Sequence, residues 1–321
     1  PPHLKAMVVA LSTSVRSYSW YPGDSLALEV MIPWDIGAVG FNKPKSTAVV
    51  EDVSPESIER RMAELREAFF HLPLGDVIRH VTGEHLQLYH DQLEHSRADD
   101  PFWAPLDFSS TLHDWDIPIL LVDGWQDYPL PGVCDDYERL RDAGATVRLR
   151  IGAGGHTGGG GEGGLTDAPR DWFDTHLLGR PDLLERPLPD RPVTVHVQGE
   201  GGAWRDLDDW PPPTSTPTRW YLHPGGRLST EPPAEPSAPD RYRYDPADPT
   251  PAAGGIGMLT GGVVDNRSLE ARDDVLVYTS DELTEPLEII GPVSAELFVT
   301  SSLDHTDFFV RVCDVHPDGR S

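Results

Sequence analysis

The stretch Ile117-Pro118-Ile119-Leu120-Leu121-Val122, which continues into Asp123-Gly124-Trp125-Gln126-Asp127, decides the fold of this chain. Its first half is a short apolar run, typical of a strand buried on both faces of a parallel sheet. Its second half places polar residues just after that strand. In an open α/β sheet, functional groups gather at the carboxyl ends of the strands. We therefore expect this stretch to lead into a functional site.

Strands and helices alternate on either side of this stretch. The runs Leu4–Leu11 and Thr146–Ile151 are also predicted as buried strands, and helices are predicted at about 132–141 and 171–178. Residues 55–95 form a separate block of polar helices between the first two strands. Strands that alternate with helices at these spacings indicate a parallel α/β sheet.

The pattern changes near residue 184, where prolines precede a series of short alternating segments. Many short strands separated by proline and glycine favour an antiparallel β-sandwich. The predicted strands are Val193–Val197, Thr218–His223, Asp274–Thr279, Leu287–Ile290, Ala295–Thr300 and Phe308–Val315.

Composition excludes several classes of protein. The 321 residues carry 26 basic and 53 acidic side chains, so the net charge is 26 − 53 = −27. Nucleic-acid phosphates and anionic membrane surfaces would repel such a chain, and neither is predicted as a partner. No stretch approaches the roughly 18 apolar residues of a membrane-spanning helix. The two cysteines, Cys134 and Cys313, form no disulfide framework and no thiolate metal cluster.

Neither a metal nor a cofactor is predicted. The histidines between residues 71 and 95 lack the i,i+4 spacing of a helical metal site. The chain begins Pro1-Pro2-His3 without methionine or signal peptide, so we expect a piece of a longer protein. A cytoplasmic location is predicted, and the sequence does not decide whether the protein forms a homodimer.

Two titratable residues follow neighbouring strands of the predicted sheet. Asp127 comes after the strand that ends near Val122, and His156 lies in the glycine-rich loop 152–164. An aspartate that accepts a hydrogen bond from an imidazole fixes its tautomer and stabilises the imidazolium formed during acyl transfer. The order acid, then histidine, is that of α/β hydrolases. A turn aspartate and a solvated loop histidine are the alternative interpretation.

Three other acids compete with Asp127 for this role. Asp123 is expected within the strand, and Asp135 and Asp136 in the first turns of a helix, where their charge suits the helix dipole. We therefore interpret Asp135 and Asp136 as structural.

A nucleophile is missing from the sequence. No Gly-x-Ser-x-Gly or Gly-x-Ser-x-x-Gly occurs. Ser12 and Ser14 lack the flanking glycines of a nucleophile elbow, and Gly23-Asp24-Ser25-Leu26-Ala27 lacks the glycine that should follow the serine. These serines are interpreted as ordinary loop residues. We expect the nucleophile upstream of Pro1 and negligible turnover by residues 1–321 alone.

Several motifs, in order, carry a resemblance to a known family. The first motif, Gly124-Trp125-Gln126-Asp127, matches the family's Gly-Trp-x-Asp around a catalytic acid. The other motifs are Gly152–His156, Asp171–Gly179 and Tyr244–Pro249. The chain resembles the cocaine esterase/X-prolyl dipeptidyl-peptidase family of serine hydrolases from Leu4 to Ser321. Ala153 and Gly154 replace the residues usual before the catalytic histidine.

The resemblance implies a partial α/β-hydrolase domain over residues 1–184, with a parallel sheet and a helical cap inserted at about 36–108. A partial all-β jelly-roll sandwich would follow over 185–321. The family hydrolyses acyl esters or amides through serine, histidine and aspartate. By position, His156 would be the general base and then acid, and Asp127 the carboxylate that orients it.

The resemblance also implies substrate-binding residues. Trp34 matches a cap tryptophan that lines the acyl pocket, and Met258 and Leu259 match apolar residues at its rim; ordinary core packing stays open for all three. Tyr128-Pro129 stand where the amino-acid ester hydrolases of the family carry acidic residues that hold an ammonium. A small-molecule ester with an apolar acyl group is therefore favoured. An X-prolyl dipeptidyl-peptidase, a β-lactam acylase and a non-catalytic β-sandwich binding module are the alternatives.

Overall fold

The structure, a computed structural model, describes residues 3–41, 54–156, 167–184, 188–199, 201–259 and 261–321. These residues form two compact units. The first comprises Pro1–Leu188 and Gly257–Leu259, and the second comprises Pro189–Ile256 and Thr260–Ser321.

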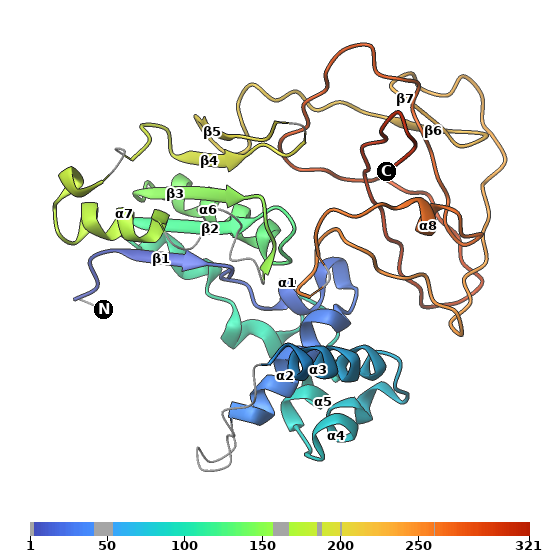
Figure 1. The fold of residues 1–321 in the computed structure, drawn as a ribbon, viewed down its shortest axis with the longest axis horizontal. Coiled ribbons are helices and arrows are strands. Elements are labelled where there is room, and N and C mark those ends of the chain that lie inside the picture. Colours follow the sequence, from blue (N-terminus) through green and yellow to red (C-terminus); the bar gives the residue numbers. More distant parts are fainter. Residues whose placement is uncertain (1–2, 42–53, 157–166, 185–187, 200, 260) are drawn as a thin grey trace. The chain divides into compact units, whose positions relative to one another are not determined.

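Three strands of the first unit lie side by side and parallel to one another (Figure 1). They are β1 (Met7–Ala10), β2 (Ile119–Gly124) and β3 (Val147–Gly152), with β2 in the middle. All three predicted strands are confirmed. β2 continues two residues beyond the predicted end at Val122, so Asp123 lies within the strand, as expected. Every residue of β2 is buried, which explains its unbroken apolar run.

Helices pack on this sheet. α6 (Leu130–Asp142) connects β2 to β3 and packs against both strands. α7 (Asp167–His176) buries Trp172 against Leu120 and Val122. These two residues are two positions apart in β2 and therefore face the same side of the sheet. Both predicted helices are confirmed, with small shifts at their ends.

The segment between β1 and β2 is helical, as predicted. Its helices are α1 (Ser17–Trp20), α2 (Leu28–Phe41), α3 (Pro55–Ala68), α4 (Val77–Thr82) and α5 (Gln87–Glu94). Short 3₁₀ turns lie at Pro22–Asp24, Leu74–Asp76, Pro101–Leu106 and Ser109–Asp114. Helical structure thus begins well before residue 36. The domain limits 36–108 and 184/185 stay predictions, and 42–53 and 185–187 lie outside the described residues.

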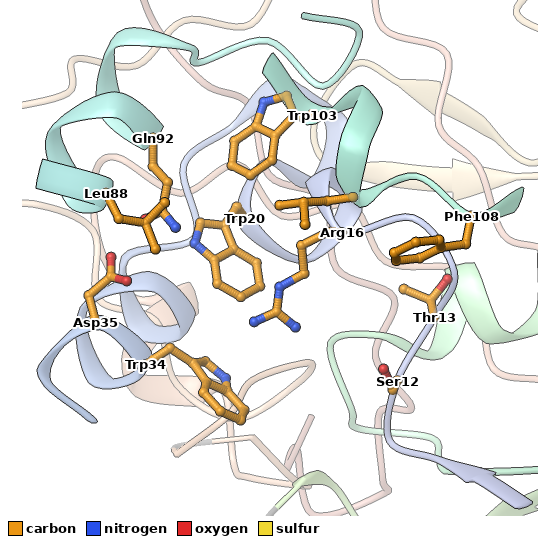
Figure 2. Close-up of a pocket in the computed structure, with 11 residues that line it drawn as sticks. Ser12, Thr13, Arg16, Trp20, Trp34, Asp35, Leu88, Gln92, Trp103 and Phe108 are labelled. Atoms are coloured by element: carbon orange, nitrogen blue, oxygen red, sulfur yellow. The ribbon is translucent and has the colours of Figure 1, made fainter. Parts of the chain in front are cut away.

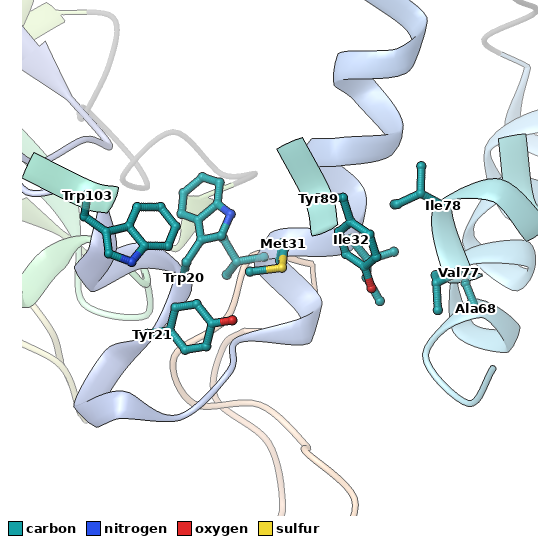
Figure 3. Close-up of a cluster of buried hydrophobic side chains, with 10 residues drawn as sticks. Trp20, Tyr21, Met31, Ile32, Ala68, Val77, Ile78, Tyr89 and Trp103 are labelled. Atoms are coloured by element: carbon teal, nitrogen blue, oxygen red, sulfur yellow. The ribbon is translucent and has the colours of Figure 1, made fainter. Parts of the chain in front are cut away.

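An apolar core of its own holds this helical segment together (Figure 3). Met31 and Ile32 of α2, Val77 of α4 and Tyr89 of α5 are fully buried in it. The Tyr89 hydroxyl donates to the carbonyl of Leu74 at 2.8 Å, so the buried ring leaves no unpaired polar atom. This core fixes α2, which carries one wall of the site.

The second unit contains two antiparallel strand pairs. β4 (Val193–His196) pairs with β5 (Trp204–Leu207), and β6 (Tyr221–His223) pairs with β7 (Arg227–Ser229). A single helical turn, α8, spans Arg267–Glu270. The predicted strand at Val193–Val197 is confirmed one residue shorter, whereas only the second half of the predicted strand at Thr218–His223 forms a strand.

Four predicted strands of the second unit are wrong in this structure. The segments 274–279, 287–290, 295–300 and 308–315 carry no strand beyond a single bridge from Arg227 to Thr279. Alternating apolar residues favour a strand, but a ladder also needs a neighbouring backbone to bond with. These segments lack such neighbours among the described residues, and several of their apolar side chains are exposed.

The first unit is therefore a parallel α/β fold with a helical insertion, and the second unit is a β domain. Among the described residues, no helix is both long enough and apolar enough to cross a membrane.

Candidate active site

Two loops meet at the carboxyl ends of β2 and β3. The amide of Trp125 donates to the Gly152 carbonyl at 3.1 Å, and the amide of Gln126 donates to the Gly154 carbonyl at 3.2 Å. A Cβ on Gly155 would lie 3.1 Å from the Gln126 carbonyl oxygen. The glycines of the predicted loop therefore allow the backbones to approach closely. Residues 157–164 of that loop lie outside the described residues.

This pairing of loops brings together the two residues predicted as catalytic. Nδ1 of His156 lies 3.1 Å from each carboxylate oxygen of Asp127. The Asp127 side chain is fully buried, and the His156 side chain is 16 % exposed. When Nδ1 carries its proton and donates to Asp127, Nε2 is left as a proton acceptor. No described residue hydrogen bonds to Nε2.

Asp127 has two further polar neighbours. The amide of Tyr128 donates to Asp127 Oδ1 at 2.8 Å. The second neighbour is the buried Asp123 carboxyl, whose Oδ2 has no hydrogen-bond partner among the described residues. Burial, together with the nearby charge of Asp127, raises the pKa of Asp123 far above its ordinary value. Asp123 is thus a buried acid next to the residue that holds His156.

The two other competing acids lie in α6, as expected, in its second turn rather than its first. Asp136 is buried and accepts hydrogen bonds from the Thr13 hydroxyl, the Ser14 amide and the Ser14 hydroxyl, at 3.0, 2.6 and 2.5 Å. It therefore fastens the loop after β1 to α6. Asp135 is partly exposed and lies 3.8 Å from Arg139.

Aromatic side chains surround the imidazole of His156. The ring of Tyr128 packs against it at 4.8 Å between centroids, and the ring of Trp34 meets it edge-on at 6.4 Å. Trp34 also donates its indole N–H to the Tyr128 hydroxyl at 3.1 Å. The structure thus places Trp34, predicted from the resemblance, beside His156. Tyr128 was not predicted as a site residue, although it directly follows Asp127.

Met258 and Leu259 belong to the first unit, although they lie far along the chain. The Gly257 amide donates to the Gln126 carbonyl at 3.2 Å, and the Leu259 amide donates to the Glu29 carboxylate at 2.6 Å. Met258 packs on the apolar core of the helical segment, as do Trp34 and Tyr128. Neither Met258 nor Leu259 lines the two pockets described below, and their binding role stays a prediction.

A pocket of about 310 Å³ opens beside His156. Its lining residues come from the end of β1 and the segment after it, from α2 and from the loops after β2 and β3: Ala10, Leu11, Ser12, Arg16, Trp34, Tyr128 and His156. Ser12 reaches this pocket, but no hydrogen bond joins it to His156. Arg16 was missed by the sequence analysis because nothing in its neighbourhood marks it as part of a site.

No group of three or more His, Cys, Asp or Glu side chains that could hold a metal ion occurs among the described residues.

The parallel sheet, the helical segment between β1 and β2 and the paired Asp127 and His156 define the class as an α/β hydrolase. Residues 1–158 match the family model of the X-Pro dipeptidyl-peptidase (S15 family), and residues 189–321 match that of the X-Pro dipeptidyl-peptidase C-terminal non-catalytic domain. The chain belongs to this cocaine esterase/X-Pro dipeptidyl-peptidase family of serine hydrolases.

Individual relatives agree with the family. The chain is 31 % identical to a cocaine esterase of Rhodococcus sp. (strain MB1 Bresler) over 348 aligned positions. This alignment covers 99 % of the chain. The chain spans 59 % of that relative's length. A solved aminopeptidase from a marine sediment Thaumarchaeota archaeon shares the fold, with a TM-score of 0.62 and 23 % identity. That match covers 90 % of this chain and 50 % of the archaeal one.

Proposed function

We propose that the full polypeptide containing residues 1–321 hydrolyses carboxylic esters through a serine, His156 and Asp127. The observation that carries the proposal is the contact between His156 Nδ1 and both oxygens of Asp127 at 3.1 Å. The similarity to a cocaine esterase favours an ester as the substrate.

Each residue has a defined task in this mechanism. Asp127, as the anion, accepts a hydrogen bond from the Nδ1–H of His156 and holds the imidazole in one tautomer. Nε2 of His156 then takes the proton of the serine hydroxyl as the oxygen attacks the ester carbonyl. His156 returns that proton to the departing alcohol, and a water repeats the sequence to release the acid.

The serine is proposed to lie outside residues 1–321. This sequence contains no Gly-x-Ser-x-Gly, and the chain spans only 59 % of the length of the cocaine esterase relative. Residues 1–321 alone are therefore expected to turn over esters negligibly, because the oxyanion hole and nucleophile would both be missing.

Amide hydrolysis is the second candidate, since the matching family model describes an X-Pro dipeptidyl-peptidase. The kcat/KM values of the full polypeptide for a 4-nitrophenyl ester and for an X-Pro 4-nitroanilide distinguish ester hydrolysis from amide hydrolysis. We expect the ester to be the better substrate by kcat/KM. A reversed order would replace the esterase proposal with the peptidase.

The test of the mechanism is His156→Ala in the full polypeptide. Loss of this base should lower kcat by about 10⁴-fold or more, with labelling of the serine by a fluorophosphonate lost in parallel. His113→Ala, at an exposed histidine away from the site, is the matched control and should leave turnover unchanged. Full turnover by His156→Ala would contradict the proposal.

A further inference from the structure

The pocket beside His156 continues into a larger one of about 470 Å³ (Figure 2). The two pockets share Ser12, Arg16 and Trp34. The larger pocket is lined by Ser12, Thr13, Arg16, Trp20, Trp34, Asp35, Leu88, Gln92, Trp103, Leu106 and Phe108. Apart from Arg16 and Asp35, every side chain in this list is uncharged.

Arg16 is held in place without an acidic partner. Its guanidinium stacks on the ring of Trp20 at 3.8 Å and lies 5.6 Å from the ring of Trp34. Figure 2 shows it directed into the space between these two indoles. No ion pair or side-chain hydrogen bond joins it to the described residues. Burial lowers the pKa of Arg16, yet an arginine stays charged at neutral pH.

Asp35 does not neutralise this charge by direct contact. Its side chain lies in α2, it is only 3 % exposed, and no described donor reaches its Oδ2. Burial, opposed by the Arg16 charge, raises the pKa of Asp35 to about 7. At slightly acid pH the carboxyl is therefore mostly protonated, and the pocket keeps the positive charge of Arg16.

We propose that Arg16 forms an anion subsite beside His156, and that the protein prefers esters whose acyl group carries a carboxylate. The planar guanidinium offers paired N–H donors that match a carboxylate, and stacking on Trp20 fixes their direction. The aromatic walls would contact the methylene groups that link the carboxylate to the scissile carbonyl.

This inference rests on the proposed ester hydrolysis and names its substrate class. It replaces the apolar acyl group expected from Tyr128-Pro129 with one that is apolar along its length and anionic at its end. If Arg16 only packed on Trp20, the charge of the substrate would make no difference to turnover.

Three 4-nitrophenyl esters of the same five-carbon acyl length test the subsite on the full polypeptide at pH 6.5. They are the hydrogen glutarate, which is anionic, the valerate, which is neutral, and the 5-aminovalerate, which is cationic. We expect kcat/KM to fall in that order, with about tenfold between anion and neutral ester, as for one charge-assisted hydrogen-bonded pair.

Arg16→Met keeps an apolar stem on Trp20 and removes the charge. It should abolish the preference for the glutarate ester, so that the glutarate and valerate esters are hydrolysed with equal kcat/KM. Arg16→Lys should keep part of the preference. Arg180→Met removes the same charge from an exposed arginine and should preserve the preference fully.

Calorimetry compares the binding of monoethyl glutarate with that of ethyl valerate. This measurement tests the anion subsite separately from the proposed ester hydrolysis. If no ester is hydrolysed but monoethyl glutarate binds and Arg16→Met prevents it, the hydrolase proposal fails and the subsite stands. If the esters are hydrolysed equally well with or without a carboxylate, or the cationic ester is preferred, the anion subsite is overturned.

Discussion

The carboxyl groups of Asp123 and Asp127 are neighbours in a region where neither residue is exposed, and no described donor reaches Oδ2 of Asp123. Two neighbouring buried carboxylates repel each other, so one of the two groups carries a proton. Asp127 accepts from the Tyr128 amide and lies against His156, whereas Asp123 has only the Gly124 amide, at 2.7 Å. The anion is therefore better stabilised on Asp127, and the proton belongs to Asp123.

Replacing Asp123 tests this assignment. Asp123→Asn keeps a donor towards Asp127, so the full polypeptide should retain hydrolysis within about threefold of wild type. Asp123→Leu loses the donor and should lower kcat about tenfold or more, because Asp127 would hold His156 less firmly. The kcat of the two variants is measured with one 4-nitrophenyl ester. Equal kcat values would argue against a role of Asp123 in positioning Asp127.

The pH dependence of stability gives a second readout for Asp123. Its pKa is higher in the folded than in the unfolded chain, so its contribution to stability is largest at acid pH and is lost as the pH rises. The melting temperature of Asp123→Asn should therefore gain on wild type as the pH rises from 4 to 9. Asp116→Asn, at an exposed residue, should show no such gain.

Gly155→Ala tests the close approach of the loops that follow β2 and β3. The added Cβ would lie 3.1 Å from the Gln126 carbonyl oxygen, so the backbone must shift by a few tenths of an ångström. We expect kcat to fall about tenfold, with little change in melting temperature, because the strain acts where His156 is positioned. Gly179→Ala, shortly after the end of α7, serves as the control for kcat. An unchanged kcat in Gly155→Ala would mean that the loops tolerate separation.

The contact between Asp127 and His156 could be foreseen because it follows from local pattern. Each residue comes directly after a buried apolar strand, and parallel strands carry such residues to one edge of the sheet. Trp34 was foreseen only through the family resemblance. In all three cases the sequence near the residue carried the signal.

Arg16 and Asp35 could not be foreseen in the same way. Their position at one pocket depends on how α2 packs on a core built from α4 and α5, which is a tertiary contact without a local signal. In the second unit the opposite error occurs, because a local pattern predicts strands that the structure does not contain. The segment 295–300 has a good strand pattern, but pairing depends on a neighbouring backbone that the pattern does not describe.

Asp35→Asn should stabilise the protein at high pH. The pKa of Asp35 is about 7 in the folded chain and 3.8 ordinarily, because burial outweighs the attraction of Arg16. Stability from this group is present below pH 4 and is lost as the pH rises to 7. The difference in unfolding free energy should therefore favour Asp35→Asn by up to about 4 kcal/mol more at pH 8 than at pH 4.

Urea unfolding at the two pH values measures this difference, with Asp116→Asn again as the exposed control. If the difference in unfolding free energy between wild type and Asp35→Asn is the same at both pH values, folding does not raise the pKa of Asp35, and this carboxyl is ionised at pH 6.5. In that case Arg16 would be compensated, and the anion preference of the pocket would weaken.

Asp135→Ala and Asp136→Ala form a pair of neighbouring substitutions in α6 with opposite expectations. Asp136 is buried and holds Thr13 and Ser14 through three hydrogen bonds, one of them from a backbone amide. Its loss leaves these donors unpaired, so Asp136→Ala should cost about 3 kcal/mol of unfolding free energy. Asp135 makes one 3.8 Å contact with Arg139 at the surface, and Asp135→Ala should cost less than about 1 kcal/mol. Urea unfolding compares them, and equal losses would mean that Asp136 does not fasten the loop after β1, which carries Ser12 and Arg16 into the pocket.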